Sequence, residues 1–245
     1  MRQALVFGAS GQIGDALVRR LLDAGWQVVA VSRDTQVDAP GLRWLRGDLA
    51  HCEGLPRAVD AIFSCGPLDV FADWYASTMA MASPRVIAFG STSAATKADS
   101  VEAGERGLAQ RLRDAELKLH AAADARGAAT VLRPTLVYGA GRDRSISRLA
   151  AAARRLGWLP VPRGADGMRQ PVHVDDLAVA AIAACDAPAA CGNDYDLPGG
   201  EALPWRAMVE RTLATMAPPP RVLTLSAPLF ALAVRCARML GQGEG

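Results

Sequence analysis

The sequence predicts an α/β protein built on a doubly wound parallel sheet. Three features point to this fold class: a glycine-rich turn after the first apolar run, an alternation of short apolar runs with longer helical stretches, and a chain of 245 residues of which 51% are hydrophobic. A chain of this length and composition can bury one large core. Alternating strands and helices are the pattern of repeated βαβ units, whose strands pair in parallel.

Short runs rich in apolar and β-branched residues are expected to form the strands of this sheet. They are Ala4–Phe7, Gln27–Val31, Leu42–Leu45, Ala61–Ser64, Val86–Phe89 and Thr130–Arg133. Leucine and alanine at helical spacing predict the helices between the strands. We expect these helices at Ile13–Ala24, Ala50–Val59, Phe71–Met81 and Glu102–Arg126. Asp99 and Glu102 form a variant of the capping box at the start of the last helix.

Composition and charge exclude several classes of partner. The net charge of +2 is small and the arginines are scattered along the chain, so we expect no nucleic-acid partner. The cysteines have no C-x-x-C spacing and no clustered histidines beside them, and no secretory leader precedes the first strand. We therefore expect no metal site, a cytoplasmic protein, and free thiols at Cys52, Cys65, Cys185, Cys191 and Cys236. We expect a monomer or a homodimer that acts on a small molecule.

The strongest chemical signal is the turn from Gly8 to Gly14, which has a glycine at every third position between a strand and a helix. Gly8 permits the tight turn, Gly11 lets the backbone approach a diphosphate, and Gly14 allows close packing of helix and strand. The free amides at the helix start favour an anion. The turn predicts a dinucleotide-binding Rossmann fold, against the alternative of an ordinary tight turn. The expected cofactor contacts are Gly8, Ser10, Gly11, Gln12, Ile13 and Gly14.

The end of the second strand indicates which dinucleotide is bound. NAD enzymes usually place a carboxylate there, whereas this chain has Ser32 and Arg33. A guanidinium can pair with a 2′-phosphate, so NADP(H) is favoured over NAD(H). In the alternative interpretation, Arg33 is a solvated surface residue and Asp34 binds the ribose. After the third strand, Asp48 and Leu49 are expected near the adenine, although Asp48 could equally cap the next helix.

The chain is expected to divide near residue 134. Residues 1–134 form the dinucleotide-binding core, and residues 135–245 form a smaller substrate-binding lobe interleaved with the last strands. Helices are expected in this part at Ser145–Arg155 and from Asp175 or Asp176 to Cys185. The apolar run from Val222 to Val234 is shorter than the roughly 20 residues that cross a bilayer. We expect it to be a packed terminal helix, with contact to a membrane surface as the alternative.

Several motifs resemble those of the extended and atypical short-chain dehydrogenase/reductases, the group called NAD(P)-dependent epimerase/dehydratases. The motifs are Gly8–Gly14, Gly47–Leu49, Phe89–Ser93, Arg133–Gly139 and Arg169–Ala178. The resemblance covers most of the chain. It implies an NAD(P)-binding Rossmann fold with a small C-terminal substrate lobe, in which the Arg-Pro strand end borders the nicotinamide. It also implies cofactor contacts at Cys65, Gly66, Pro134 and Leu136.

The chain departs from this family at the catalytic helix. Relatives that work as reductases or epimerases carry Tyr-x-x-x-Lys there, in which the tyrosine moves a proton and the lysine lowers its pKa. If Glu116 is the glutamate that follows this motif, the two positions fall on Leu108 and Leu112. Neither Lys97 nor Lys118 stands at the spacing that would replace the pair.

Few residues could rebuild a proton-transfer site. Thr92 aligns with the family's catalytic Ser/Thr and has Ser91 beside it, but a hydroxyl is a poor acid without help. Tyr138 is the one phenol near the expected pocket, and its alternative role is packing at a strand end. His173 stands just before a helix, where a hydrogen-bonded structural histidine is the more common case. The catalytic candidates are therefore Thr92, Tyr138 and Ser91.

Two hypotheses about function follow. The first is an NADP(H)-dependent oxidoreductase or epimerase-like enzyme that acts on a small carbonyl or hydroxyl compound by hydride transfer. The second is a protein that holds NADP(H) without turnover, as a sensor, regulator or assembly partner. Arg142, Arg144 and Arg148 could bind an anionic substrate or the cofactor diphosphate, or could form a solvated helix face. A metal-dependent or nucleophilic hydrolase lacks paired residues at the required spacing.

Overall fold

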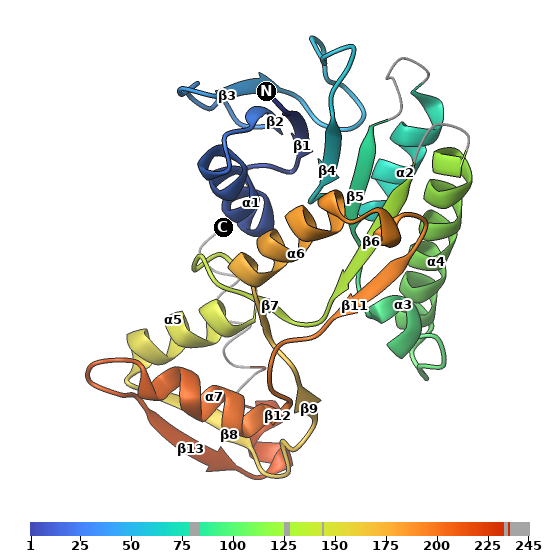
Figure 1. The fold of residues 1–245 in the computed structure, drawn as a ribbon. Coiled ribbons are helices and arrows are strands. Elements are labelled where there is room, and N and C mark those ends of the chain that lie inside the picture. The colour runs from blue at the N-terminus through green and yellow to red at the C-terminus, as the bar shows by residue number, and fades with distance from the viewer. Residues whose placement is uncertain (79–83, 125–127, 144, 233–234, 236–245) are drawn as a thin grey trace. The chain divides into compact units, whose positions relative to one another are not determined.

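The computed structural model describes residues 1–78, 84–124, 128–143, 145–232 and 235 (Figure 1). Its contacts divide the chain into two compact units. The first unit comprises Met1–Val137 and Val172–Pro198, and the second comprises Tyr138–Pro171 and Gly199–Gly245. The expected boundary near residue 134 lies close to the first crossing, and the segment from Val172 to Pro198 returns to the first unit.

A parallel sheet of seven strands forms the centre of the first unit, in the order β11-β6-β5-β4-β1-β2-β3. The strands are β1 (Gln3–Phe7), β2 (Gln27–Ser32), β3 (Leu42–Arg46), β4 (Ala61–Ser64), β5 (Arg85–Phe89), β6 (Ala129–Pro134) and β11 (Asp194–Leu197). The predicted fold class is confirmed. Each of the predicted strands is present with ends within one residue of those expected, and β11 is an addition.

Helices cover both faces of this sheet, as expected for a doubly wound fold. Helices α1 (Gln12–Asp23) and α6 (Val174–Asp186) pack on one face, and α2 (Leu68–Ser77) and α4 (Ala103–Asp124) pack on the other (Figure 1). Because side chains alternate along a strand, β1 supplies Val6 to the first face and Phe7 to the second. Burial on both faces explains the nearly continuous apolar runs of the strands.

One predicted helix is absent, and others differ from the prediction in their bounds or caps. Residues 50–59 contain no helix, because Gly54 has a left-handed φ of 75° and Pro56 follows it. Helix α2 begins earlier than predicted and ends at Ser77, and Met81 and Arg126 lie outside the described residues. Helix α6 is capped by His173, whose Nδ1 accepts from the Asp175 N–H, and not by either aspartate.

The start of α4 also differs from the capping box that the sequence suggested. Ser100, and not Asp99, makes the local contact, because its Oγ accepts from the Glu102 N–H at 3.2 Å. The Ser100 hydroxyl in turn donates to Glu105 Oε2 at 2.6 Å. A short helix, α3 (Ser93–Thr96), precedes α4, and Arg113 Nη1 joins the two by donating to the Ala94 carbonyl at 2.9 Å.

The second unit has its own small core. Its elements are α5 (Ile146–Leu156), β8 (Trp158–Pro162), β9 (Met168–Arg169), β12 (Leu203–Pro204), α7 (Trp205–Ala214) and β13 (Arg221–Leu225). β13 pairs in parallel with β8, and Leu159 and Val161 of β8 are buried with Val209 and Leu213 of α7. Of the remaining short elements, β7 (Val137–Tyr138) pairs with β10 (Val172–His173). β10 and η1 (Pro188–Ala190) belong to the first unit.

The apolar run near the C-terminus is not the single helix that was predicted. Arg221–Leu225 is a strand, because alternate residues of this run can face the core beside β8, and the chain turns helical only at residue 227. Val234 lies outside the described residues, as do Cys236 and Arg238. Within the described part of the chain, no helix has the length and apolarity needed to span a membrane.

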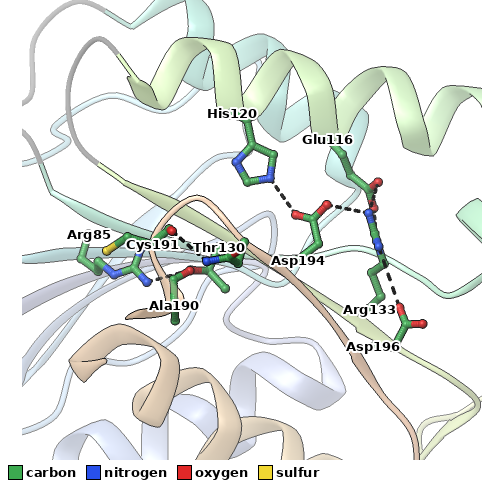
Figure 2. A network of polar contacts seen from close by, with 10 residues as sticks. Arg85, Glu116, His120, Thr130, Arg133, Ala190, Cys191, Asp194 and Asp196 are labelled. Carbon is green, nitrogen blue, oxygen red and sulfur yellow. Dashed lines mark hydrogen bonds and ion pairs between the residues drawn. The ribbon is translucent and has the colours of Figure 1, made fainter. Parts of the chain in front are cut away.

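A network of charged side chains ties α4 to the edge of the sheet (Figure 2). Arg133 on β6 makes a two-pronged contact with Glu116 on α4, with Nε and Nη2 each 2.7 Å from a carboxylate oxygen. The same Nη2 donates to Asp194 on β11 at 2.6 Å. Asp194 also hydrogen-bonds His120 on α4 at 2.7 Å. One guanidinium thus joins a helix and two neighbouring strands, and it fixes the rotation of α4.

Asp194→Asn tests the contribution of this network to stability. Burial raises the pKa of Asp194, but the hydrogen bond with His120 and the charges of Arg133 and His120 outweigh it and leave the pKa below 3.8. Because folding lowers the pKa of Asp194, its ionised carboxylate stabilises the protein at pH values above its pKa in the unfolded chain. This stabilisation is lost as the pH falls through the pKa of the folded state. We expect a loss of about 2 kcal/mol in unfolding free energy at pH 7, less than for a fully buried pair because Asp194 is partly exposed.

Urea denaturation at pH 7 and at pH 3 measures this difference, which should shrink at the lower pH. Asp196→Asn is the control, because its carboxylate is 61% exposed and stands 3.9 Å from the Arg133 guanidinium. Equal losses in the two variants would contradict the assignment.

Candidate functional site

A cleft of about 650 Å³ opens in the first unit at the carboxyl ends of four neighbouring strands. Its walls come from the segments that follow β1, β2, β3 and β4. β1 and β4 are adjacent, and the helices that follow them, α1 and α2, pack on opposite faces of the sheet. Doubly wound sheets bind ligands at such a point, where the connections separate.

Many of the residues predicted from the sequence to contact a cofactor line this cleft. They are Gly8, Ser10, Gly11, Ser32, Arg33, Asp48, Leu49, Cys65 and Gly66. Gln12, Ile13, Gly14, Pro134 and Leu136 were predicted as contacts and are not part of the lining. The cleft adds Asp34, Pro67 and Val70, which follow predicted positions in the chain. Contact of each residue with a dinucleotide stays a prediction.

The glycine turn has the close contacts that its sequence predicts. Gly8 has a left-handed φ of 68°, and a β-carbon there would lie 2.9 Å from the backbone carbon of Cys65. A β-carbon on Gly14 would lie 2.2 Å from the Gly8 carbonyl oxygen. The cap residue of α1 is Gly11, which has no side chain to occupy the first amides of the helix. Those amides therefore suit the diphosphate of a dinucleotide.

Two serines connect the glycine turn to the end of β2. Ser32 Oγ donates to Ser10 Oγ at 3.0 Å, and the same Ser32 oxygen accepts from the Asp34 N–H at 3.2 Å. Ser32 is buried, whereas Arg33 and Asp34 are exposed and both line the cleft. The bond to Ser32 fixes the backbone on both sides of Arg33. The guanidinium can therefore reach a ligand while its backbone stays in place.

Asp48 caps a turn, and not the helix that was predicted after it. Its Oδ1 accepts from the N–H groups of Ala50 and His51, each at 2.9 Å. These two bonds, that of His51 first, lower the pKa of Asp48, and the charges of His51 and Arg33 lower it further. Asp48 is thus an acceptor at neutral pH, as a role at the adenine amino group would require.

Beyond β4 the cleft wall is apolar and holds a thiol. Burial raises the pKa of Cys65 to about 12, so its sulfur stays protonated at neutral pH. A protonated thiol is a weak nucleophile, so Cys65 is a wall residue of the cleft.

The hydroxyls of Ser91 and Thr92, which follow β5, make hydrogen bonds that the sequence did not predict. Thr92 Oγ1 donates to the Pro134 carbonyl at 3.4 Å, and the Thr92 N–H donates to the same oxygen. The Thr92 proton therefore points to β6. Ser91 Oγ accepts from the Ser93 N–H at 3.2 Å, which leaves its own proton to donate. This geometry favours Ser91 over Thr92 as a donor to a substrate oxygen.

The other candidates fall into different parts of the chain. Tyr138 begins the second unit, and His173 caps α6, which is the structural role that its position suggested. Arg142 and Arg148 are exposed residues of the second unit, and Arg144 lies outside the described residues. Their roles stay predictions.

Helix α4 presents apolar side chains at the two positions where the family's catalytic pair is expected from the sequence. Glu116, the reference for counting, lies next to the β5 end, with Oε1 3.4 Å from where a β-carbon of Gly90 would stand. Leu112 is one turn before Glu116, and it packs against the core under α2 and α4. Leu108 is one turn earlier still. That Leu108 and Leu112 occupy the positions of the catalytic pair stays a prediction.

One polar cluster near these leucines was not anticipated. Lys97 Nζ stands 2.6 Å from Glu105 Oε1, and Ser100 Oγ donates to the other Glu105 oxygen at 2.6 Å. Both hydrogen bonds, that of Lys97 first, lower the pKa of Glu105. Lys97 and Glu105 are eight residues apart on either side of a loop. This spacing follows neither helical nor strand periodicity, so no sequence pattern could have indicated the contact.

Comparison of the chain with known proteins shows the family to which it is similar. The model of the NAD-dependent epimerase/dehydratase family matches residues 4–70. The chain is 31% identical to a 2-alkyl-3-oxoalkanoate reductase of Stenotrophomonas maltophilia, over 88% of this chain and 76% of that protein. It is 27% identical to a mitochondrial NADH dehydrogenase subunit of Arabidopsis thaliana, the alpha subcomplex subunit 9, over 92% of this chain and 61% of the other.

A solved structure shares the fold. MoeE5, determined in complex with UDP-glucuronic acid and NAD, superimposes with a TM-score of 0.72 at 23% identity. The match covers 92% of this chain and 86% of that one.

Gly14→Ala tests the close packing of the glycine turn. The added β-carbon would collide with the Gly8 carbonyl, which is backbone and cannot move aside. We expect a loss of about 3 kcal/mol in unfolding free energy, the upper range for overpacking. Gly107→Ala in α4 is the control, because only the end of the Arg111 side chain stands near its β-carbon position, at 3.9 Å. That variant should gain about 1 kcal/mol from higher helix propensity. Urea denaturation measures both, and a neutral Gly14→Ala would contradict the packing argument.

Proposed function

Because the chain belongs to the NAD-dependent epimerase/dehydratase family, we propose that it is an NADP(H)-dependent oxidoreductase acting on a small carbonyl or hydroxyl compound. The observation that carries the proposal is the cleft in which an uncapped helix start, Ser32 and Arg33 line one continuous surface. The resemblance to a reductase over three quarters of its length supports the same reaction class.

NADP(H) fits the charges of this cleft better than NAD(H). The amides of residues 12–14 would hold the diphosphate, and Arg33 would pair with the 2′-phosphate beside the Ser32 hydroxyl. Asp34 is the opposing feature, because its carboxylate lines the same wall and repels a phosphate. Asp34 donates a hydrogen bond to Ser32 Oγ through its backbone N–H, and the Asp34 side chain is exposed to solvent.

The bound nicotinamide would supply or accept a hydride. The protein must orient the carbonyl and balance its charge, and Ser91 has a hydroxyl proton to donate to the oxygen. Leu108 and Leu112 stand at the positions where the family's tyrosine and lysine are expected from the sequence, and neither can donate a proton. A proton for the product oxygen must then come from another group.

An anionic substrate fits the distribution of charge. The second unit carries twelve arginines against five acidic residues, whereas the first carries more acidic than basic residues. This excess of arginine favours a carboxylate, which guanidinium groups bind through paired hydrogen bonds. The oxoalkanoate named for one relative is a carbonyl compound with a carboxylate. We therefore propose an oxo acid as the substrate class.

A second function is favoured by specific observations. The two positions of α4 at which the catalytic pair is expected from the sequence are leucine, and the chain resembles a subunit of NADH dehydrogenase. A protein that holds NADP(H) without turnover, as a regulator or assembly partner, would need the same cleft and no proton donor.

Arg33→Ala tests the choice of cofactor. Loss of the guanidinium should weaken NADPH binding at least tenfold and change NADH binding less than twofold, because only NADPH has the 2′-phosphate. Isothermal titration with both dinucleotides measures this. Arg43→Ala, which removes an exposed arginine of β3 outside the cleft lining, is the control. Equal affinity of the natural chain for both dinucleotides would contradict the proposal.

A panel of paired substrates tests turnover and substrate class together. Oxidation of NADPH is followed with 3-oxo acids and with their methyl esters, which differ only in the negative charge. We expect kcat/KM for the acids to exceed that for the esters at least tenfold, and the difference to narrow at high salt. If no compound turns over while NADPH still raises the Tm, the binding protein is the correct function.

A further inference from the structure

The geometry points to Lys97 as the proton donor of this enzyme, held in place by Glu105 and Ser100. This inference rests on the proposed reductase function and deepens it. Lys97 did not qualify from its sequence position, because it precedes α4 and cannot occupy the spacing of the family's lysine. The fold brings it to the catalytic helix by another path, through the loop between α3 and α4.

The cluster lies beside the segment expected to meet the substrate. Lys97 caps the end of α3, and Thr92 caps its start, five residues earlier. At the helical rise per residue, these two positions are about 7.5 Å apart. Ser91, the free hydroxyl donor, directly precedes Thr92. A lysine side chain at this place can reach the same substrate oxygen as Ser91.

The cluster also lies on the face of α4 where the tyrosine is missing. Glu105 stands three residues before Leu108, so the two side chains share one face of the helix. Arg113 binds the Ala94 carbonyl and holds α3 against α4. The ion pair with Glu105 thus holds the Lys97 ammonium about one helical turn from Leu108, the position at which the family's tyrosine is expected.

The chemistry balances with the groups present. When the carbonyl carbon gains a hydride, the electron pair of the C=O π bond moves to the oxygen, and Lys97 Nζ gives that oxygen a proton. The alcohol forms, and the lysine is left as a neutral amine. Its side chain is 34% exposed, so water returns the proton. In oxidation of an alcohol, the neutral amine accepts the hydroxyl proton as the hydride leaves.

Other groups of the first unit fit this task less well. The Thr92 hydroxyl already donates a hydrogen bond to the Pro134 carbonyl. The raised pKa of Cys65 keeps the Cys65 proton on its sulfur. Tyr75 is buried in the core between α2 and the sheet. Lys118, the second lysine of the chain, pairs with Asp73 on the outer side of α4.

The experiment compares Lys97→Ala with Lys118→Ala, which removes the one other lysine and leaves the cluster intact. With an oxo acid that the natural chain reduces, Lys97→Ala should lose at least a hundredfold in kcat, in the range of general acid catalysis. Ethylamine in the buffer should restore at least tenfold of that loss. NADPH affinity and Tm should stay unchanged, which separates lost chemistry from lost folding. Lys118→Ala should behave like the natural chain.

A second readout does not depend on turnover. The chain has two lysines, so protein labelled with [15N]lysine gives two side-chain ammonium signals. Addition of the alcohol product to the NADP⁺ complex should shift the Lys97 signal and leave that of Lys118 in place. Lys97→Arg, which keeps the charge but holds its proton too tightly, should bind the product and remain slow.

The outcomes separate the two proposals. Turnover by the natural chain with undiminished kcat in Lys97→Ala overturns the role of Lys97 and leaves the reductase intact. A slow Lys97→Ala that amines do not restore, with no product shift of the Lys97 signal, also overturns it. Absence of turnover by the natural chain itself overturns the reductase, and the role of Lys97 falls with it.

Discussion

The absence of a β-carbon at Gly14 is the constraint on which the nucleotide-binding half of the structure depends. The Gly8 carbonyl occupies the space that any side chain at Gly14 would need. Helix α1 can therefore begin after a four-residue turn at the end of β1, and its cap residue Gly11 lines the cleft. The same approach brings Ser10 to Ser32, and the Ser32 bond to the Asp34 N–H sets the backbone around Arg33. One close contact thus orders both the turn proposed to hold a diphosphate and the segment proposed to hold a 2′-phosphate.

A second ordering element is the guanidinium of Arg133. It contacts Glu116 and Asp194, and it stands on the strand that also supplies the Pro134 carbonyl to Thr92. These contacts fix the positions of α4 and of the Ser91–Thr92 segment relative to β6. They do not depend on which residues stand at positions 108 and 112 of α4. Arg133 therefore has a structural role in this protein, through its contacts with Glu116 and Asp194. Leu112 on α4 adds apolar packing against the core of the first unit.

Most of the fold was predictable from patterns that are local in the sequence. The elements that were not predicted depend on partners far away in the chain. The strands of the first half were predictable because both faces of the sheet are buried, and the glycine turn located the cleft. Elements fixed by distant partners were not predictable. β11 pairs with β6 about sixty residues earlier, and β13 is a strand only because β8 offers an edge. In the site, Lys97 and Glu105 meet across a loop, and Thr92 turns to Pro134, contacts that depend on the assembled sheet.

The position of β11 at the edge of the sheet has a consequence for the order in which the protein is made. β6 has been synthesised long before residues 194–197 leave the ribosome, and the chain between them builds the first half of the other unit. During that interval the outer edge of β6 has unpaired backbone groups, and Arg133 lacks Asp194 as a partner. An open strand edge invites pairing with another chain. The late strand gives β6 its second neighbour and leaves the short β11 as the edge of the finished sheet.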